Sequence, residues 1–494
     1  MRIQTIRALF LLGPIALVST SACTDDAPGD ELGDTTGDGD GDPTTGDGDG
    51  DPTTGDGDGD PTTGDGDGDP TTGDGDGDPT TGDGDGDGEL VRFTVDDAAA
   101  GSAWVTIADI TGDGQLDLVV SRFGSIGGFS IPNGDVVLYT RTGGLGDWQE
   151  TTLISDQENI KFPNQTSAHD FDGDGDLDIL VPYGFLACAA APPNTPCGGL
   201  LWLEQTQNGW TKHDIVQNGA TLFYHHGEWV DFDGDGVEDL VTVGEEGPAL
   251  LGGDPGQAQA QWFKGTGAGF ETTPRAIGAG LGSLPTVLDL DGDGDLDVAS
   301  AQYFDESASF AWFERTADPS QGNPNGSFVH HIIDDQVGPS IQLSFIDDFH
   351  GDGKLVAVGS NHTNTNDDAN DPESGIYTYE IPADPKQEGW TRKKISTGIV
   401  SEMSPLFGPQ GAPGIFGAGD IDGDGDLDLF VSGDGDKKVY WVEQAAPGAF
   451  VTRIVENPLG QAGGMKFADL DGNGTVEAVV TGYEANVVYI YTWQ

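Results

Sequence analysis

Positively charged residues are scarce in this sequence. Its 494 residues include 19 Lys and Arg against 86 Asp and Glu, which gives a formal net charge of −67 at pH 7. Nucleic acid is not expected as a partner, because phosphate binding requires clustered Lys and Arg. So large a negative charge repels itself unless cations bind. Ca²⁺ suits this composition, because it takes carboxylate and carbonyl oxygens as ligands.

An apolar run long enough to cross a bilayer is missing from the N-terminal region. Arg2 and Arg7 form a short basic segment, and residues 8–18 are mainly apolar. This run is too short to span a membrane and is typical of an export signal. We therefore expect residues 1–22 to be a signal peptide that is removed on export.

The end of this segment resembles a bacterial lipoprotein signal, in which Cys23 becomes the lipidated first residue. Thr20 departs from that motif, which usually carries Leu at this position. The resemblance implies an outer-membrane or cell-surface lipoprotein that touches the membrane only through its lipid. The alternative is ordinary cleavage after Ala22, which would leave a soluble secreted protein.

Residues 23–89 lack the large apolar side chains that a core requires. The unit Pro-Thr-Thr-Gly-Asp-Gly-Asp-Gly-Asp recurs from Pro43, and its last copy begins at Pro79. Such a segment cannot offset its ordering entropy. We expect a disordered acidic linker that lifts a domain off a membrane. A second interpretation is that the Asp-Gly tracts bind calcium weakly and stiffen.

Long stretches of helical periodicity are missing from residues 90–494, which instead repeat a unit of four short strands. An apolar run leads into an Asp-rich loop, and a short apolar strand follows it. A third strand carries aromatic residues, and a fourth often begins with Trp or Phe. Short strands with Gly-rich turns indicate an all-β fold. The fourth-strand aromatics are Trp148, Trp210, Phe270, Phe328, Trp390 and Phe450.

The Asp-rich loop occurs seven times at near-regular spacing. Successive copies begin 61, 61, 58, 59, 72 and 49 residues apart. Recurrence of a four-stranded unit predicts a seven-bladed β-propeller. The loops begin at Asp109, Asp170, Asp231, Asp289, Asp348, Asp420 and Asp469.

The seventh unit has no fourth strand of its own, because the chain ends after its third. Residues 90–97, before the first unit, are similar in pattern to residues 450–457, the fourth strand of unit six. We predict that the N-terminal strand, at about 90–96, completes the last blade. This closure removes an exposed sheet edge. We expect a monomer.

The chemistry of the loop is clearest in its second copy, residues 170–178. Carboxylates occupy positions 1, 3, 5 and 9, and glycines at positions 4 and 6 let the chain curl tightly. Position 7 varies among the loops, which indicates that it contributes its backbone carbonyl. Crowded carboxylates repel one another at short range, and a bound Ca²⁺ converts that repulsion into coordination.

An EF-hand is excluded because its position-12 carboxylate is missing from all seven loops. That loop requires a bidentate Glu at position 12 and flanking helices. The residues at this position are Val120, Val181, Thr242, Ser300, Gly359, Val431 and Val480.

The loop resembles that of the FG-GAP/VCBS repeat family, including the calcium-binding propeller of integrin α-chains, from about Leu90 to the C-terminus. In that family D-x-D-x-D-G-x-x-D joins the first two strands of a blade. The resemblance implies several structural Ca²⁺ sites. The complete ligand sets are Asp170/Asp172/Asp174/Asp178, Asp231/Asp233/Asp235/Asp239, Asp289/Asp291/Asp293/Asp297 and Asp420/Asp422/Asp424/Asp428.

Three loops depart from the family's pattern. The first and seventh keep four oxygen-bearing residues, and we expect weaker binding by the seventh. The fifth has His350 at position 3 and Val356 at position 9, so we do not expect it to bind calcium. The ligand sets of the first and seventh loops are Asp109/Thr111/Asp113/Asp117 and Asp469/Asp471/Asn473/Glu477.

Cysteine is almost absent, with three residues in all. Cys188 and Cys197 lie in one Pro-rich loop of a protein that we expect to be exported. A small disulfide between them is therefore predicted. A thiol nucleophile is disfavoured because no base lies nearby in the sequence.

The loops opposite the Asp-rich turns are the expected binding face, because loops on a rigid scaffold commonly carry function. The resemblance implies a non-catalytic module that binds a protein or a glycan there. Single aromatic residues in such loops more often pack beneath them than contact a ligand. The aromatic candidates are Phe123, Phe129, Tyr183, Phe185 and Phe407.

Catalytic motifs are missing: there is no G-x-S-x-G, no H-E-x-x-H and no phosphate-cradling loop. The one enzymatic hint is His225, His226 and His362, with Glu228 near the first two. These residues could line a wet central channel or bind a transition metal. Their convergence would favour the alternative function, a carbohydrate-active lyase or dehydratase.

Overall fold

The computed structural model describes residues 88–125, 132–184, 197–246, 257–303, 308–363, 373–401, 403–404, 408–409, 411–460 and 462–494. In these ranges the regular structure is β-strand, apart from one short 3₁₀-helix, η1 (Asp156–Glu158). No helix in the described part is long and apolar enough to cross a membrane. The predicted signal peptide and linker, including Cys23, lie outside the described residues.

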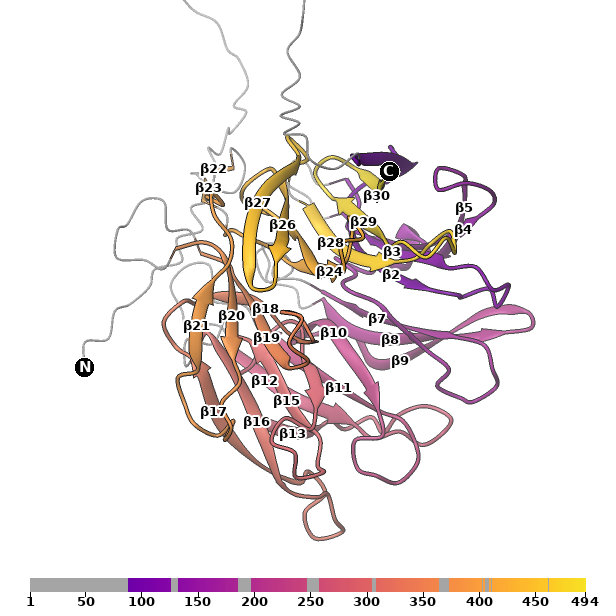
Figure 1. Cartoon of the computed structure of the whole chain (residues 1–494). Coiled ribbons are helices and arrows are strands. Elements are labelled where there is room, and N and C mark those ends of the chain that lie inside the picture. The colour runs from indigo at the N-terminus through magenta and orange to yellow at the C-terminus, as the bar shows by residue number, and fades with distance from the viewer. Residues whose placement is uncertain are drawn as a thin grey trace, which may run out of the picture. The chain divides into compact units, whose positions relative to one another are not determined.

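Seven four-stranded antiparallel sheets form the blades of a propeller (Figure 1). The first three blades are β2 (Ser102–Ala108), β3 (Asp117–Arg122), β4 (Asp135–Arg141) and β5 (Trp148–Ile154); β6 (Ser167–His169), β7 (Asp178–Tyr183), β8 (Gly198–Thr206) and β9 (Gly209–Ala220); and β10 (Phe223–Val230), β11 (Asp239–Glu246), β12 (Gln257–Phe263) and β13 (Arg275–Ala279). The next three are β14 (Thr286–Leu288), β15 (Asp297–Ala301), β16 (Phe310–Ala317) and β17 (Ser327–Asp334); β18 (Ser340–Asp347), β19 (Leu355–Asn361), β20 (Ile376–Glu380) and β21 (Thr391–Lys394); and β24 (Phe416–Gly419), β25 (Asp428–Ser432), β26 (Val439–Ala446) and β27 (Ala449–Glu456). A two-stranded sheet, β22 (Met403–Ser404) and β23 (Gly408–Pro409), precedes the sixth blade.

The seventh blade joins the two ends of the described chain. It consists of β28 (Ala462–Ala468), β29 (Glu477–Gly482), β30 (Val487–Trp493) and β1 (Leu90–Asp96), in that order. β1 runs antiparallel to β30, with Leu90 opposite Trp493 and Phe93 opposite Ile490. Figure 1 shows the indigo first strand beside the yellow last one. The predicted seven-bladed all-β propeller and its closure by the N-terminal strand are confirmed.

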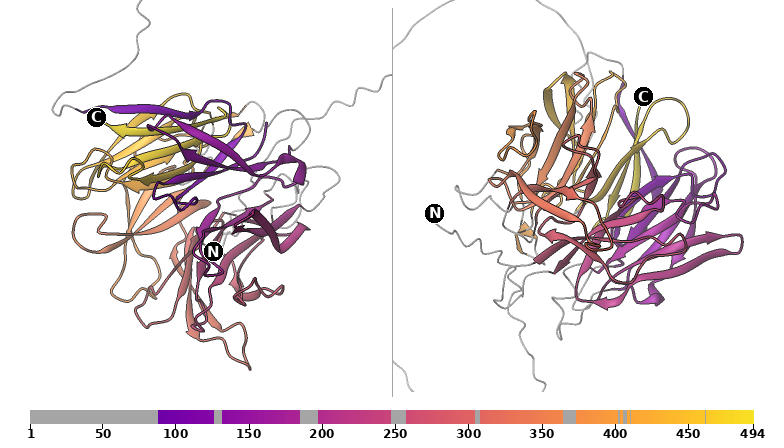
Figure 2. Two further views of the ribbon diagram at one scale, coloured as in Figure 1. Left: turned by 90° about the vertical axis from the view of Figure 1, so that its right-hand side faces the viewer. Right: turned by 90° about the horizontal axis from the view of Figure 1, so that it is seen from below.

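The first strands of the blades lie nearest the axis, because several contact the first strands of neighbouring blades, as β28 contacts both β2 and β24. The blades follow one another around that axis in chain order (Figure 2). Each Asp-rich loop joins a first strand to a second strand, so all seven loops lie on the same side of the ring. The ends of the second strands face the other side.

Aromatic third strands fill the space between blades. Trp262 of β12 and Phe313 of β16 belong to one buried cluster, and Trp312 of β16 packs with Tyr379 of β20 in the next. Burying a large aromatic side chain contributes about 1.5–3 kcal/mol, so the alternating faces of these strands hold adjacent blades together.

One predicted strand start is wrong. The fourth strand of the third blade begins at Arg275 rather than at Phe270. Phe270 forms a bridge with Gly265 and stacks on Phe171 of the second blade, with ring centroids 4.5 Å apart. Phe270 therefore packs in the core between the second and third blades, and it precedes the fourth strand in the chain.

Candidate metal centres

A shared hydrogen bond shapes all seven Asp-rich loops. The backbone N–H at position 6 donates to the carboxylate at position 1, as Gly175 does to Asp170 at 3.1 Å. Gly173 and Gly175 have φ values of 74° and 99°, the left-handed region that glycine adopts without strain. A Cβ at either glycine would meet nothing within 4 Å, so backbone conformation rather than crowding requires glycine there. The same bond is made by Gly114, Gly236, Gly294, Gly353, Gly425 and Gly474.

The carboxylate at position 9 connects the loop to the rest of its blade. Asp297 begins β15, is fully buried, and accepts hydrogen bonds from Leu290 N at 3.0 Å and Arg315 N at 2.9 Å. Leu290 belongs to the loop and Arg315 to the third strand. This structural role was not predicted from the sequence, where position 9 was interpreted only as a ligand. Equivalent bonds to the third-strand side come from Gln205 N, Gly265 N and Gln444 N.

Five loops bring three acidic side chains close enough to share one metal ion. Within each group the ligand oxygens lie within 4.8 Å of one another. All four complete loops and the seventh loop contain such a group. The groups are Asp170/Asp172/Asp174, Asp231/Asp233/Asp239, Asp289/Asp291/Asp297, Asp420/Asp422/Asp424 and Asp469/Asp471/Glu477.

Position 5 is where the structure differs most from the predicted ligand sets. Asp113 and Asp293 were predicted as ligands, but neither belongs to a group of acidic side chains that could share an ion. Like Asn473, the predicted position-5 ligand of the seventh loop, each is exposed, and one side-chain oxygen accepts the backbone N–H of position 7, at 2.8 Å for Asp113, 3.0 Å for Asp293 and 2.7 Å for Asn473. Asp174 and Asp424 make the same bond within their groups, so it permits coordination without directing the side chain inward. Coordination by the other three stays a prediction.

Three further predicted ligands of the complete loops also lie outside these groups. Asp178 and Asp428 occupy position 9 and accept hydrogen bonds from Gln205 N and Gln444 N, at 2.9 and 2.8 Å. Asp235 is exposed and is paired with a lysine described below. The structure therefore assembles three of the four predicted carboxylates in each complete loop, and the fourth differs from loop to loop.

The first and fifth loops form no group of three such acidic side chains among the described residues. In the first loop, the Thr111 hydroxyl donates to Asp117 at 3.1 Å, so its oxygen lies beside the position-9 carboxylate. In the fifth, Lys354 pairs with Asp352 at 2.8 Å. The expectation that the fifth loop does not bind calcium stays a prediction.

The position-9 carboxyl groups have raised pKa values. Burial raises the pKa of Asp178 and Asp239 to about 6 and that of Asp297 and Asp428 to about 7, and neighbouring loop carboxylates push in the same direction. These groups are held where their charged form is disfavoured.

Several carboxylate oxygens in these loops are buried without a hydrogen-bond donor. They include Oδ1 of Asp170, Asp233 and Asp420. Buried polar atoms are otherwise almost always paired. Asp170, Asp233 and Asp420 each belong to a group of three acidic side chains, and such groups fit a hard cation with oxygen ligands.

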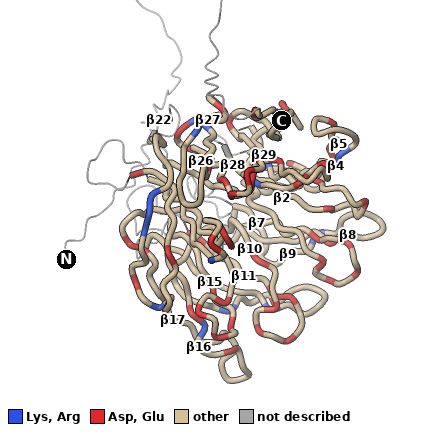
Figure 3. Tube along the Cα trace, viewed as in Figure 1, with Lys and Arg blue, Asp and Glu red and all other residues tan. Residues whose placement is uncertain are grey.

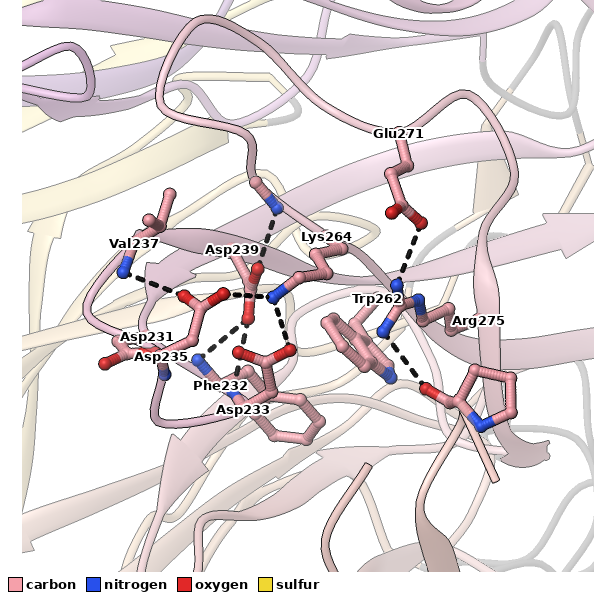
Figure 4. Close-up of polar contacts among 12 residues, drawn as sticks. Asp231, Phe232, Asp233, Asp235, Val237, Asp239, Trp262, Lys264, Glu271 and Arg275 are labelled. Atoms are coloured by element: carbon pink, nitrogen blue, oxygen red, sulfur yellow. Dashed lines mark hydrogen bonds and ion pairs between the residues drawn. The ribbon is translucent and has the colours of Figure 1, made fainter. Parts of the chain in front are cut away.

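Two lysines from outside the loops already reach these carboxylates. Figure 4 shows the Lys264 ammonium between Asp233 and Asp235, and it lies 2.5 Å from an oxygen of each. This pairing lowers the pKa of Asp235. In the fourth loop, Lys386 lies 2.8 Å from Asp291. The third and fourth loops therefore have part of their negative charge neutralised by the protein itself.

The three candidate histidines do not form one centre. His225 pairs with Glu245 at 3.0 Å, His226 with Glu228 at 3.1 Å and His362 with Asp434 at 3.5 Å. In the described part of the chain, none of the groups able to share a metal ion contains a histidine. A shared transition-metal site built from these histidines is therefore not supported.

The end of the propeller opposite the Asp-rich loops carries a series of contacting side chains around the axis. Phe123 lies 5.6 Å from Tyr483 between ring centroids, and the Tyr483 hydroxyl donates to Asp434 at 2.8 Å. Asp434 pairs with His362, whose ring is 5.3 Å from that of Tyr303.

The series continues into the third blade through electrostatics, because Glu245 and Asp434 both contribute to raising the pKa of Tyr303, after burial. The described ends of blades one, three, four, five, six and seven each supply one member. We call Phe123, Glu245, Tyr303, His362, Asp434 and Tyr483 the axial ring. Only Phe123 and His362 were singled out from the sequence, because no single residue type recurs from blade to blade in the ring.

None of the other aromatic candidates on this face belongs to the axial ring. Tyr183 is buried in the interblade core, as the packing interpretation expects. Phe129, Phe185 and Phe407 lie outside the described residues. Cys197 is disulfide-bonded, whereas Cys188 lies outside the described part, so their pairing stays a prediction.

Comparison with known proteins supports the resemblance to FG-GAP/VCBS propellers. Residues 231–300 and 420–480 match FG-GAP-like repeats, and each segment contains two Asp-rich loops, the third and fourth in one and the sixth and seventh in the other. No curated protein matches the chain.

Among solved structures, BBS1N from its complex with ARL6DN aligns at 12% identity, covering 81% of this chain and 95% of that one, with a TM-score of 0.45. The α-L-arabinanase of Penicillium chrysogenum, complexed with arabinobiose, aligns at 8% identity over 82% and 97%, with a TM-score of 0.42.

The raised pKa values predict how the metal-free protein responds to acid. A carboxyl group whose folded-state pKa lies above its ordinary value binds a proton in the folded state first. Stability in EDTA should therefore rise as the pH falls from about 7.5 to about 5. Asp428→Asn removes one such charge and should increase the free energy of unfolding at pH 7.5 by on the order of 2 kcal/mol.

Urea unfolding in EDTA at both pH values measures this effect. Asp426→Asn, at position 7 of the same loop, is the matched control and should change little. If the two variants behave alike, the electrostatic interpretation of position 9 is wrong.

Proposed function

We propose that this protein is an exported, surface-anchored propeller of FG-GAP/VCBS repeats that is stabilised by calcium. It acts as a non-catalytic, adhesion-type module that binds a protein or a glycan through the face opposite the calcium loops. The observation that carries this proposal is the axial ring, where aromatic and charged side chains from six blades meet on that face.

The loops supply the structural half of the proposal. In the complete loops Ca²⁺ would be held by the carboxylates at positions 1, 3, 5 and 9. The bound ion neutralises charge that burial disfavours and occupies oxygens that lack donors. An ion bound at 100 times its Kd stabilises the folded state by about 2.7 kcal/mol per site. Ca²⁺ is the best fit because it takes 6–8 oxygen ligands in flexible geometry.

The axial ring supplies the binding half. Phe123, Tyr303, Asp434 and Tyr483 are each partly exposed. Aromatic faces flanked by carboxylates and imidazole are suited to sugars and to protein side chains. Because a different strand positions each group, the ring is preorganised, which reduces the entropy lost on binding.

Export and anchoring rest on the sequence. Lipidation of Cys23 would attach the chain to a membrane, and residues 24–89 would hold the propeller away from it. Figure 3 shows the same charge imbalance in the propeller, with acidic residues recurring in its loops and few basic ones. Such a surface favours a soluble monomer at the end of its tether.

A carbohydrate-active lyase or dehydratase is the second candidate. One observation favours it: the phenol of Tyr303 lies near the carboxylates of two separate pairs, His225–Glu245 and His362–Asp434. A tyrosine and a histidine could exchange protons with a substrate there. The absence of a single histidine centre among the described residues makes binding the preferred function.

A glycan and surface-protein binding screen of the mature chain in calcium tests the proposal. Phe123→Ser and Tyr483→Ser should each weaken capture of a ligand by about tenfold, since aromatic anchors commonly contribute 1–2 kcal/mol. Ile454→Ser is the control, because Ile454 is an exposed apolar side chain on an outer strand. Ligands bound equally by all variants would refute the face assignment, and an unsaturated sugar product would favour the lyase.

The lysine in the third loop generates a separate prediction. Lys264 and Ca²⁺ compete for Asp233 and Asp235, so Lys264→Met should tighten the third site by about tenfold, the equivalent of 1.4 kcal/mol. Calcium titration calorimetry of the variant and the wild type measures the change. Lys212→Met, which removes an exposed ion pair with Glu158 on an outer strand, is the control. Unchanged calcium affinities in Lys264→Met would show that the lysine does not compete.

A further inference from the structure

Lys466 is unusual among the basic residues of this protein. It lies on β28, and the seven first strands around the axis contain no other Lys or Arg. Most of the described basic side chains are ion-paired, as Arg92 is with Glu456 and Arg392 with Asp334. Lys466, by contrast, makes no hydrogen bond or ion pair with the described residues, although acidic residues greatly outnumber basic ones in the chain.

The Lys466 side chain lines the central channel. Two cavities, of about 130 Å³ and about 360 Å³, share Lys466, His226 and Gln165 in their walls. Glu228 and Trp104 also line the smaller one. We call these five residues the channel waist. Three of them line both cavities, and the other two line the smaller one beside them.

The neighbouring charged groups of the channel waist leave Lys466 available to pair with a bound anion. His226 Nδ1 donates to the Gln165 carbonyl at 3.3 Å, and His226 Nε2 lies 3.1 Å from Glu228 Oε1. Burial alone would raise the pKa of Glu228, but His226 holds it below its ordinary value. Burial lowers the pKa of Lys466, and the charge of Glu228 opposes this only in part. The lysine thus faces a cavity without a counter-ion in contact.

We propose that the channel waist is a binding site for a small hydroxycarboxylate. Its carboxylate pairs with Lys466 Nζ, its hydroxyl donates to Glu228, and Trp104 covers its carbon chain. A buried cation gains most from a hydrogen-bonded anionic partner, and the cavities are large enough for a molecule of several heavy atoms. This site is independent of the proposed ligand face, because it lies on the first strands inside the ring rather than on the axial ring.

The arrangement disfavours other occupants. A metal ion would be repelled by the ammonium group, and the described residues bring no three ligands together there. A neutral polyol would leave Lys466 unpaired. The carboxylate is therefore the part of the ligand that this site selects.

Isothermal titration of the mature protein with lactate and with lactamide tests the proposal. The two probes have nearly the same shape, but only lactate carries a charge. We expect lactate to bind and lactamide to bind at least tenfold more weakly. Lys466→Met should reduce lactate affinity at least tenfold, and Lys212→Met should not change it. Failure of the wild type to bind lactate, or equal binding by Lys466→Met, would overturn the site.

A second measurement needs no variant and so does not depend on the folding of Lys466→Met. Reductive methylation of the wild-type protein, followed by peptide mass mapping, gives the modification rate of each lysine. Lactate should slow the modification of Lys466 at least threefold while leaving Lys212 unaffected. Equal rates for Lys466 with and without lactate would refute the proposal. Neither result affects the binding screen of the axial ring, so the two proposed sites are tested independently.

Discussion

Repulsion among carboxylates at the first turn of each blade is the constraint on which the rest of the structure depends. The position-9 side chain must be buried, because it ties its loop to the third strand, as Asp297 does to Arg315 N. Burial beside two or three further carboxylates raises its pKa and leaves oxygens such as Asp170 Oδ1 without a donor. The fold therefore contains a local electrostatic strain at the same point of nearly every blade, and a cation is the simplest means of relieving it.

The loops solve this problem in more than one way. Lys264 and Lys386 bring protein cations to the third and fourth loops, and the fifth loop replaces the position-9 carboxylate by Val356. Neutralisation at the rim in turn leaves the other end of the propeller free to vary. There six of the seven blades each contribute one side chain to the axial ring, while Lys466, which makes no ion pair with the described residues, lies in the channel between the two ends. The proposed structural and recognition roles thus lie at different points along one axis.

The repeated features of this protein could be predicted from its sequence, and the unrepeated ones could not. Short apolar strands and seven similar loops predicted the blades, and the similarity between residues 90–97 and 450–457 predicted the closure by β1. The partners of position 9 were not predictable, because Gln205 and Gln444 lie on another strand. Four of the six members of the axial ring were missed, since no single residue type recurs at this position from blade to blade. The strand start predicted at Phe270 was wrong because an aromatic residue can pack between blades without lying in a strand.

The predicted ligand sets also show that the repeat pattern does not determine how single side chains are oriented. Spacing alone gives Asp293 and Asp174 the same expected role as ligands, because both occupy position 5 of their loops. The structure places only Asp174 within a group of three carboxylates. Which way an exposed side chain turns depends on its rotamer and on nearby charges, and the repeat pattern carries neither.

Thermal unfolding of the mature chain in excess Ca²⁺ and in EDTA tests the central claim most directly. If cations relieve the carboxylate strain in at least four loops, EDTA should lower the Tm by roughly 10 °C or more at neutral pH. Mg²⁺ should restore much less of the loss than Ca²⁺, because Mg²⁺ demands a smaller octahedral site. A Tm that is the same in Ca²⁺ and in EDTA would contradict the account, because the crowded loops would then be stable without a metal ion.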